Sequence, residues 1–290
     1  MTNSLSDIIG TPSLSDNAGG KVSEEDAGSR RTPIVILVDV SSSTTQGVNP
    51  DLPQIQRMLG VLVDLMRQPP AISELGAAGT TVDVAIVTYA ARPTLIQPFA
   101  AAPTVAPAPP LVASIGTCTA TALLSSLDYV GKRLAYYDTY QPAPIPKAIP
   151  HIFHLTDGAP TDVSLNDERW QLVQRLLGEL SRDKAKPFSM ITHFVSPNGM
   201  VAGHGHVTDA EGRAISGYNM LSLWTGGENV FELTSAPDMF IQLARVIAKS
   251  IGGASSQNRR INDVLQELQA PVLRKPDASR LAPPREGGAA

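Results

Sequence analysis

The sequence predicts an α/β domain in which a doubly wound, mostly parallel central sheet is flanked by helices. Short apolar segments alternate along the chain with longer segments whose apolar residues recur with the helical period. Most of the short segments are hydrophobic nearly throughout, which is typical of parallel strands that helices cover on both faces. Regular alternation of strands and helices favours a doubly wound sheet over other architectures.

The strands are expected where the short apolar runs lie. These runs cover residues 33–39, 82–90, 94–99, 150–156, 187–195 and 229–233. The first expected helix follows Asp51, which we expect to act as its N-cap. Its apolar stripe consists of Leu52, Ile55, Leu59, Leu62 and Met66. The other helical patterns cover residues 119–136, 167–182 and 236–251.

Two proline-rich segments interrupt this alternation, at residues 100–114 and 137–149. Proline removes a backbone donor and fixes φ, so no long helix or central strand can run through either segment. We expect both to be stiff connectors on the surface.

The folded domain is expected to cover residues 32–252. Residues 1–31 are rich in Ser, Gly, Asp and Glu without apolar periodicity, which predicts a disordered arm. Residues 253–290 are expected to hold a short amphipathic helix, over 260–269, and then a disordered proline-rich tail. The sequence leaves open whether this helix packs on the domain or binds a groove in a partner.

Composition narrows the class of protein. A length of 290 residues allows one or two domains, and 42% hydrophobic residues suffice for a core. The net charge of −4 gives no basic surface for nucleic acid, and no apolar run approaches the roughly 20 residues of a membrane helix. With no signal peptide evident and Cys118 as the single cysteine, we expect a cytoplasmic protein. Cys118 is better explained as a small packed residue than as a reactive thiol.

Polar side chains follow the expected strand 33–39. Asp39, Ser41 and Ser43 occupy alternating positions, so an extended chain would turn all three toward one side. Carboxylate and hydroxyl oxygens are the ligands that Mg²⁺ prefers, in octahedral geometry. Alone, an Asp-x-Ser sequence after a strand is more often a helix cap or a turn.

Two further segments supply oxygen ligands at comparable places. Thr117 directly precedes the expected helix 119–136, and Asp157 follows the expected strand 150–156 in a Thr-Asp-Gly turn. In doubly wound sheets, ligands bind outside the carboxyl ends of the strands. The joint occurrence of three such segments therefore predicts one metal site. Its expected ligands are Asp39, Ser41, Ser43, Thr117 and Asp157.

The three motifs, in this order, resemble the metal-ion-dependent adhesion site of von Willebrand factor A (VWA) domains. That site has an Asp-x-Ser-x-Ser motif, a distant Thr, and an Asp in a Thr-Asp-Gly turn. The resemblance covers about residues 33–250 and includes all five ligand positions. One difference is Ser42, where the family often has Gly, a residue that tolerates backbone conformations Ser avoids.

The resemblance implies a Rossmann-like VWA fold and a bound Mg²⁺, or Mn²⁺ or Ca²⁺ in its place. In the family, the serines and the threonine make most direct bonds to the ion, while one or both aspartates act through water. A coordination position stays open for an Asp or Glu of another protein. We therefore expect a metal-dependent protein–protein interaction module, an adaptor or scaffold, and not an enzyme.

Within this family, the sequence looks most like bacterial TerY-type proteins. The similar stretches are residues 33–39, residues 154–162 and the helix around Trp170. This similarity implies a tellurite-resistance, stress or defence system, with a protein kinase and a metal-dependent phosphatase as partners. Two alternatives remain open: an accessory subunit of a MoxR- or chelatase-type AAA+ ATPase, and a Mg²⁺-dependent phosphotransfer enzyme.

Overall fold

The computed structural model describes most residues between 13 and 195 and shorter pieces beyond. The described ranges are 13–24, 27–45, 52–67, 80–158, 160, 162–164, 167–182, 190–195, 206–208, 214–216, 220–221, 224, 230–233 and 273–274. The expected helices 236–251 and 260–269 lie outside these ranges, as does the expected N-cap Asp51.

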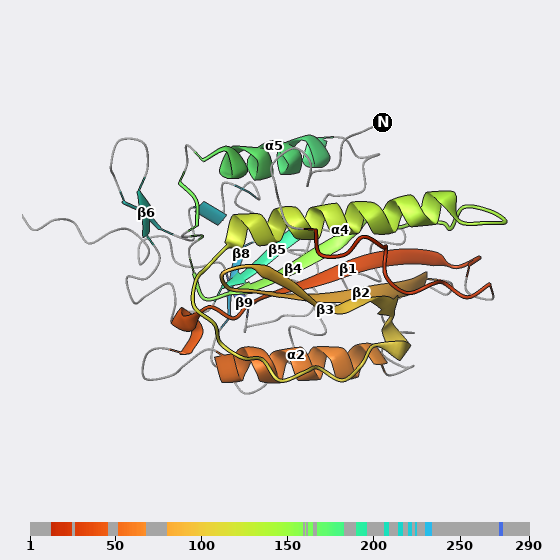
Figure 1. The fold of residues 1–290 in the computed structure, drawn as a ribbon, viewed down its shortest axis with the longest axis horizontal. Coiled ribbons are helices and arrows are strands. Elements are labelled where there is room, and N and C mark those ends of the chain that lie inside the picture. Colours follow the sequence, from red (N-terminus) through yellow and green to blue (C-terminus); the bar gives the residue numbers. More distant parts are fainter. Residues whose placement is uncertain are drawn as a thin grey trace, which may run out of the picture.

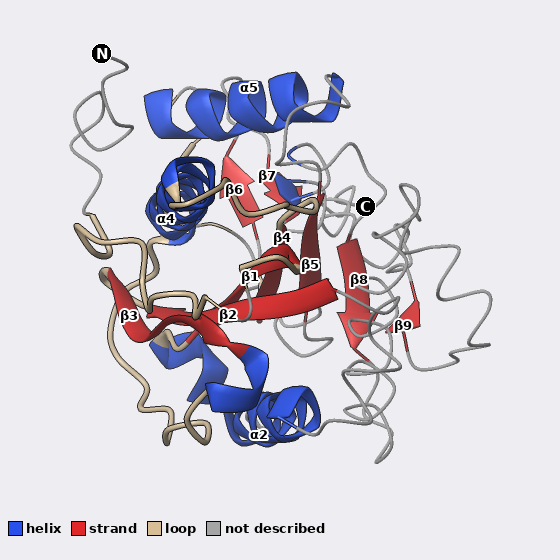
Figure 2. Ribbon diagram, turned by 90° about the vertical axis from the view of Figure 1, so that its right-hand side faces the viewer, coloured by secondary structure: helices blue, strands red, loops and turns tan. Residues whose placement is uncertain are grey.

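A seven-stranded sheet with the order β3-β2-β1-β4-β5-β8-β9 forms the centre of the described part (Figure 2). Its strands are β1 (Arg30–Asp39), β2 (Thr80–Tyr89), β3 (Pro93–Ala101), β4 (His151–Thr156), β5 (Met190–Val195), β8 (Val230–Leu233) and β9 (Leu273–Arg274). Strands β2, β1, β4, β5 and β8 are mutually parallel, whereas β3 and β9 pair antiparallel with β2 and β8. The short strands β6 (His206–Thr208) and β7 (Ala214–Ser216) form a separate antiparallel pair. The prediction of a doubly wound, mostly parallel sheet is confirmed.

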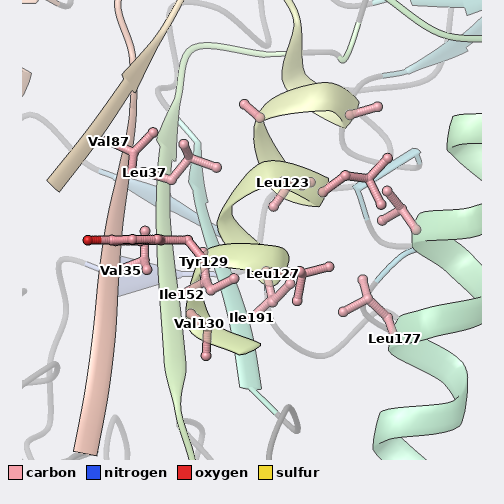
Figure 3. Packing of buried hydrophobic residues seen from close by; sticks show 14 of the residues in the cluster. Val35, Leu37, Val87, Leu123, Leu127, Tyr129, Val130, Ile152, Leu177 and Ile191 are labelled. Carbon is pink, nitrogen blue, oxygen red and sulfur yellow. The ribbon is translucent and has the colours of Figure 1, made fainter. Parts of the chain in front are cut away.

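Helices cover both faces of this sheet (Figures 1 and 2). They are α2 (Leu52–Arg67) on one face and α4 (Thr119–Thr139) with α5 (Glu168–Arg182) on the other. Alternate residues of β1 divide between the two cores, because successive side chains of a strand point to opposite faces. Ile34 and Ile36 pack with α2, whereas Val35 and Leu37 pack with α4 (Figure 3). None of the described helices is long and apolar enough to span a membrane.

Strand β1 begins at Arg30, three residues earlier than expected. The N–H of Arg31 donates to the carbonyl of Pro146 at 2.8 Å, and the N–H of Ala148 donates to the carbonyl of Arg31 at 2.8 Å. The proline-rich segment 137–149 thus pairs with the start of β1 rather than only connecting two elements. This pairing lengthens β1 beyond its apolar run.

In the other proline-rich segment, 100–114, residues 100–101 end β3 and are followed by a single-turn 3₁₀ helix, η2 (Ala102–Thr104). Gln56 of α2 holds its later part, because the side-chain amide donates to the carbonyl of Pro109 at 3.1 Å and accepts from the N–H of Leu111. Residues 109–111 of this segment are therefore fixed against α2, shortly before the loop that carries Thr117.

Residues 13–24 lie against β3 and α4, which differs from the expected disordered N-terminal arm. The N–H of Gly20 donates to the carbonyl of Phe99 in β3 at 2.7 Å. The guanidinium of Arg133 in α4 donates to the carbonyls of Ala18 and Gly20 at 3.1 and 2.6 Å. Because protein groups satisfy these backbone atoms, a segment without apolar periodicity is held in place.

A short stretch of the C-terminal segment also differs from the expectation. Leu273 and Arg274, within the expected helix-and-tail region 253–290, pair with Leu233 and Glu232 as strand β9. The pairing places this stretch beside β8 at the far side of the sheet.

A buried charge cluster lies near the amino end of β2. The carboxylate of Asp83 is fully buried and forms ion pairs with Arg31 of β1 and Arg133 of α4. The distance from Arg133 Nη2 to Asp83 Oδ2 is 2.6 Å, and the hydroxyl of Tyr137 donates to the same oxygen. Since Asp83 lies opposite Pro33 in register, the cluster is remote from the carboxyl end of β1.

Candidate metal centre

The predicted ligands come from segments at the carboxyl edge of the sheet, where the strand order reverses. Strand β1 has β2 on one side and β4 on the other. Asp39 is the last residue of β1, and Asp157 is the first residue after β4. Figure 1 shows the turn after β1 and the start of α4 at the same end of the sheet. This is the place at which doubly wound sheets bind ligands.

The first segment brings its polar atoms together by a path that differs from the expectation. The N–H of Ser41 donates to Asp39 Oδ1 at 2.8 Å, and Ser41 Oγ lies 2.8 Å from Ser43 Oγ. The chain is not extended here, because Ser42–Thr45 forms a 3₁₀ turn, η1. Thr44 closes this turn by donating its N–H and its hydroxyl to the carbonyl of Ser41, at 3.1 and 2.7 Å. The expected extended path past Ser41 is therefore wrong, although both serine hydroxyls still meet.

The spacing of the two hydroxyls fits a small octahedral ion. At Mg–O distances of 2.0–2.1 Å, two neighbouring ligands of an octahedron are about 2.9 Å apart. The 2.8 Å between Ser41 Oγ and Ser43 Oγ is close to this value, and it is also an ordinary hydrogen-bond distance. These two hydroxyls therefore match the spacing of neighbouring Mg²⁺ ligands.

The carboxylate of Asp39 is buried and held from three directions. Oδ1 accepts from Ser41, and Oδ2 accepts the hydroxyls of Tyr89 and Thr156, each at 3.0 Å. Burial raises the pKa of Asp39, and the hydrogen bonds from Ser41, Thr156 and Tyr89 offset part of this shift. All these donors are neutral. A cation beside this carboxylate would favour its ionised form.

Asp157 lies in a tight turn close to the Asp39 carboxylate and Tyr89. Asp157 is only 7% exposed. The hydroxyl of the preceding Thr156 donates to Asp39 and accepts from the N–H of Gly158 at 3.2 Å, which closes the turn. Burial raises the pKa of Tyr89 well above its usual value, and the negative charges of Asp39 and then Asp157 add to the shift. Both carboxylates thus act on one buried phenol, as expected for neighbours.

Thr117 is half-buried and is placed by the loop before α4. The N–H of Ser114 donates to the carbonyl of Val40 at 2.9 Å, which joins this loop to the chain leaving β1. Gly116 has φ +97°, and a Cβ there would lie 3.0 Å from the Cα of Ala91. A side chain at position 116 would be strained in conformation and crowded in space. This glycine allows the loop to turn closely before Thr117.

Asp162 and Arg169 tie the second and third segments together, and the sequence did not identify either role. Asp162 Oδ1 accepts from the N–H of Ala120 at 3.3 Å, in the first turn of α4. Arg169 donates to the carbonyl of Asp162 at 2.8 Å and to the hydroxyl of Thr121 at 3.1 Å. Asp162 lies five residues after Asp157, in the stretch that resembles the family, which was the available signal.

Cys118 is a packed residue, as predicted. It is 7% exposed and belongs to the core between the sheet and α4. Burial raises the pKa of its thiol to about 12, with further contributions from the charges of Asp162 and Asp39. The thiol is therefore protonated at neutral pH, as expected for a packed cysteine.

The donor chemistry is that of a hard cation. Among the residues that the structure describes, no three His, Cys, Asp or Glu side chains gather into a cluster of the kind that holds zinc. The candidate site instead combines two carboxylates with three hydroxyls, a set that suits Mg²⁺. Binding of an ion by these five residues stays a prediction.

Comparison with known proteins gives similarity of structure alone. No family model matches the sequence, and no curated protein matches it. BatB from Bacteroides thetaiotaomicron is similar at 14% identity, over 78% of this chain and 100% of its own, with a TM-score of 0.42. The vWF domain of the type V pili tip protein Mfa5 from Porphyromonas gingivalis is 14% identical, over 77% of this chain and 97% of its own, with a TM-score of 0.43.

A von Willebrand factor type A protein from Catenulispora acidiphila is 17% identical over 77% of this chain, with a TM-score of 0.40. The chain spans only 43% of that protein. Because identities and TM-scores are all low, the roles of these proteins are not transferred to this chain.

Proposed function

We propose that the chain is a VWA-type domain that binds Mg²⁺, or Mn²⁺ or Ca²⁺, and through the ion an acidic side chain of another protein. One observation carries the proposal: the carboxylate of Asp39 is buried, and its described contacts are all with neutral groups, namely the N–H of Ser41 and the hydroxyls of Tyr89 and Thr156. Burying a carboxylate in this way is costly, and a cation would offset the cost.

The five proposed ligands differ in charge. Asp39 and Asp157 together balance a dication, while the hydroxyls of Ser41, Ser43 and Thr117 add dipoles without further charge. When bound, the ion supplies an electrophilic position that a carboxylate from outside can fill. A neutral site of this kind favours one additional acidic ligand over a cationic one.

Binding is favoured over catalysis by the groups beside the site. Two described side chains near Asp39 that could act as nucleophiles are the Cys118 thiol and the Tyr89 phenol. Burial raises the pKa of both, so both are protonated at neutral pH. Phosphotransfer would need an activated nucleophile or base at this place.

The surface beside Thr117 fits a protein partner. Val112 and Ile115 are 76% and 82% exposed, and they are the two large hydrophobic side chains most exposed in the described part of the chain. Leu111 is bonded to Gln56, and Ser114 to Val40, so the backbone between them is fixed. We propose that the partner's acidic residue is flanked by apolar side chains that cover Val112 and Ile115.

The wider context remains a set of predictions from the resemblance. These are a cytoplasmic location, a tellurite-resistance, stress or defence system, and a kinase and phosphatase as partners. An accessory role beside an AAA+ ATPase is compatible with the same site, because it too would use a metal-bridged contact.

Replacing Asp157 by Ala is expected to abolish binding of Mg²⁺. The variant loses one of two carboxylates, which leaves too little negative charge to hold a dication. Titration calorimetry should show one bound ion for the wild-type chain and none for the variant. Asp138→Ala is the matched control, because it removes an exposed carboxylate of α4 that pairs with Lys147. Equal binding by wild type and Asp157→Ala would refute the site.

Replacing Ile115 by Ser is expected to weaken partner capture by about tenfold, the effect of removing about 1–2 kcal/mol of apolar contact. Because Ile115 contributes no ligand, calorimetry should give the same affinity for Mg²⁺ as in wild type. Capture is measured as the amount of partner that co-purifies from cells. If Ile115→Ser captures as much partner as wild type does, the partner does not bind at Ile115.

A further inference from the structure

A chain of buried hydrogen bonds runs behind the candidate ligand Asp39. Tyr89 ends β2 directly opposite Asp39 in register, and its hydroxyl lies 3.0 Å from Asp39 Oδ2. His154 of β4 places Nε2 2.6 Å from the same hydroxyl, and the hydroxyl of Thr119 donates to it at 3.5 Å. Tyr89 is 1% exposed and His154 is fully buried, so water does not compete for these bonds.

The chemistry of the groups fixes the direction of this chain. A phenol has one proton, and an ionised carboxylate can only accept. With Asp39 ionised, Tyr89 donates to Asp39, and the Tyr89 oxygen then accepts from a proton on Nε2 of His154. The bonds run from β4 through β2 to β1, so residues of three strands determine where one carboxylate lies.

The two oxygens of Asp39 differ as a result. Oδ2 accepts two hydroxyls, from Tyr89 and Thr156, which occupy both of its acceptor positions. Oδ1 accepts the N–H of Ser41 at 2.8 Å, and the Ser41 hydroxyl also stabilises the carboxylate. The rotation of the carboxylate, and with it the direction of Oδ1, is set by the two bonds to Oδ2.

We propose that Tyr89, oriented by His154, is a positioning residue that presents Asp39 Oδ1 to the bound ion or to a water on it. The inference rests on the proposed metal site and adds residues that supply no ligand themselves. Partners that orient a metal ligand typically change metal affinity by about 10- to 100-fold when they are removed. Tyr89 supplies no ligand, and its hydroxyl acts on the site by donating to Asp39 Oδ2.

Tyr89→Phe in the full chain removes the donor to Asp39 and keeps the ring. We expect its dissociation constant for Mg²⁺, measured by calorimetry, to rise about 10- to 100-fold. The matched control is Tyr129→Phe, which removes the same atom from another buried tyrosine, whose hydroxyl accepts from the N–H of Phe99 at 3.4 Å. If the role of Tyr89 were purely structural, Tyr89→Phe would behave like Tyr129→Phe. Both variants would then lower the thermal unfolding midpoint of the metal-free protein, and both would keep the wild-type dissociation constant for Mg²⁺.

Thr156→Val keeps the inference testable if Tyr89→Phe does not fold, because it removes the other donor to Oδ2. Its dissociation constant should rise in the same way. If wild type binds Mg²⁺ and the folded variants bind it equally well, Tyr89 and Thr156 do not position Asp39, although the metal site stands. If wild type itself binds no Mg²⁺ or Mn²⁺, the proposed function fails, and the positioning role fails with it.

Discussion

Replacing Asp83 by Ala is expected to lower the free energy of unfolding by about 3–5 kcal/mol, the cost of breaking a buried ion pair. The side chains of Arg31 and Arg133 are each 1% exposed, so both guanidinium groups would stay buried without this counter-ion. Arg133 also holds residues 18–20, and its displacement would loosen that segment. Urea denaturation followed by circular dichroism measures the change.

A control carboxylate and a milder variant sharpen this test. Asp138 pairs with Lys147 on the surface, where its side chain is 57% exposed, and its replacement by Ala should cost at most about 1 kcal/mol. Asp83→Asn keeps the shape but loses the charge, so its stability should lie between wild type and Asp83→Ala. If Asp83→Ala is as stable as Asp138→Ala, the buried cluster does not stabilise the fold.

Replacing Asp39 by Ala is expected to abolish partner capture altogether. Without the ion, an incoming carboxylate would face the negative charge of Asp157, where wild type offers a cation. Losing one member of such a desolvated charge contact costs about 2–5 kcal/mol, which is at least about 30-fold in affinity. The measurement is co-purification of partners from cells with wild type, with Asp39→Ala, and with wild type after EDTA.

Folding must be controlled separately, because Asp39 accepts bonds from two buried hydroxyls. Circular dichroism should show a native spectrum for the variant before its partners are counted. EDTA treatment leaves every side chain in place, so it separates loss of the ion from loss of structure. If all three samples retain the same partners, any metal at this site is structural and the binding surface lies elsewhere.

The sequence predicted the fold through patterns that are local. The run that became β1 is apolar because helices cover it on both faces, and its successive residues Val35 and Ile36 enter different cores. The start of β1 could not be predicted, since it depends on pairing with Pro146 and Ala148, more than 100 residues further on. Local pattern therefore identifies a strand more reliably than it fixes its ends.

In the candidate site too, local sequence patterns predicted some residues, whereas the roles of others depend on residues far along the chain. The spacing of Asp39, Ser41 and Ser43 indicated the proposed ligands, because a metal-binding loop needs particular side chains at nearby positions. Tyr89 could not be found in this way, since its role depends on the register of β1 and β2, across 50 residues. The expectation of a disordered arm differed from the structure at residues 13–24 for a related reason. Arg133, which holds that segment, lies 115 residues from Ala18.

The contact of residues 18–20 with β3 also bears on how the protein behaves among other proteins. Strand β3 ends one side of the sheet, and an uncovered outer strand is a template for pairing with another chain. Gly20 occupies the outward carbonyl of Phe99, and Gly19 lies so close that a Cβ would come within 2.7 Å of the Phe99 Cβ. At Phe99 the segment therefore occupies a hydrogen-bonding position of the outer strand that an added strand from another chain would need.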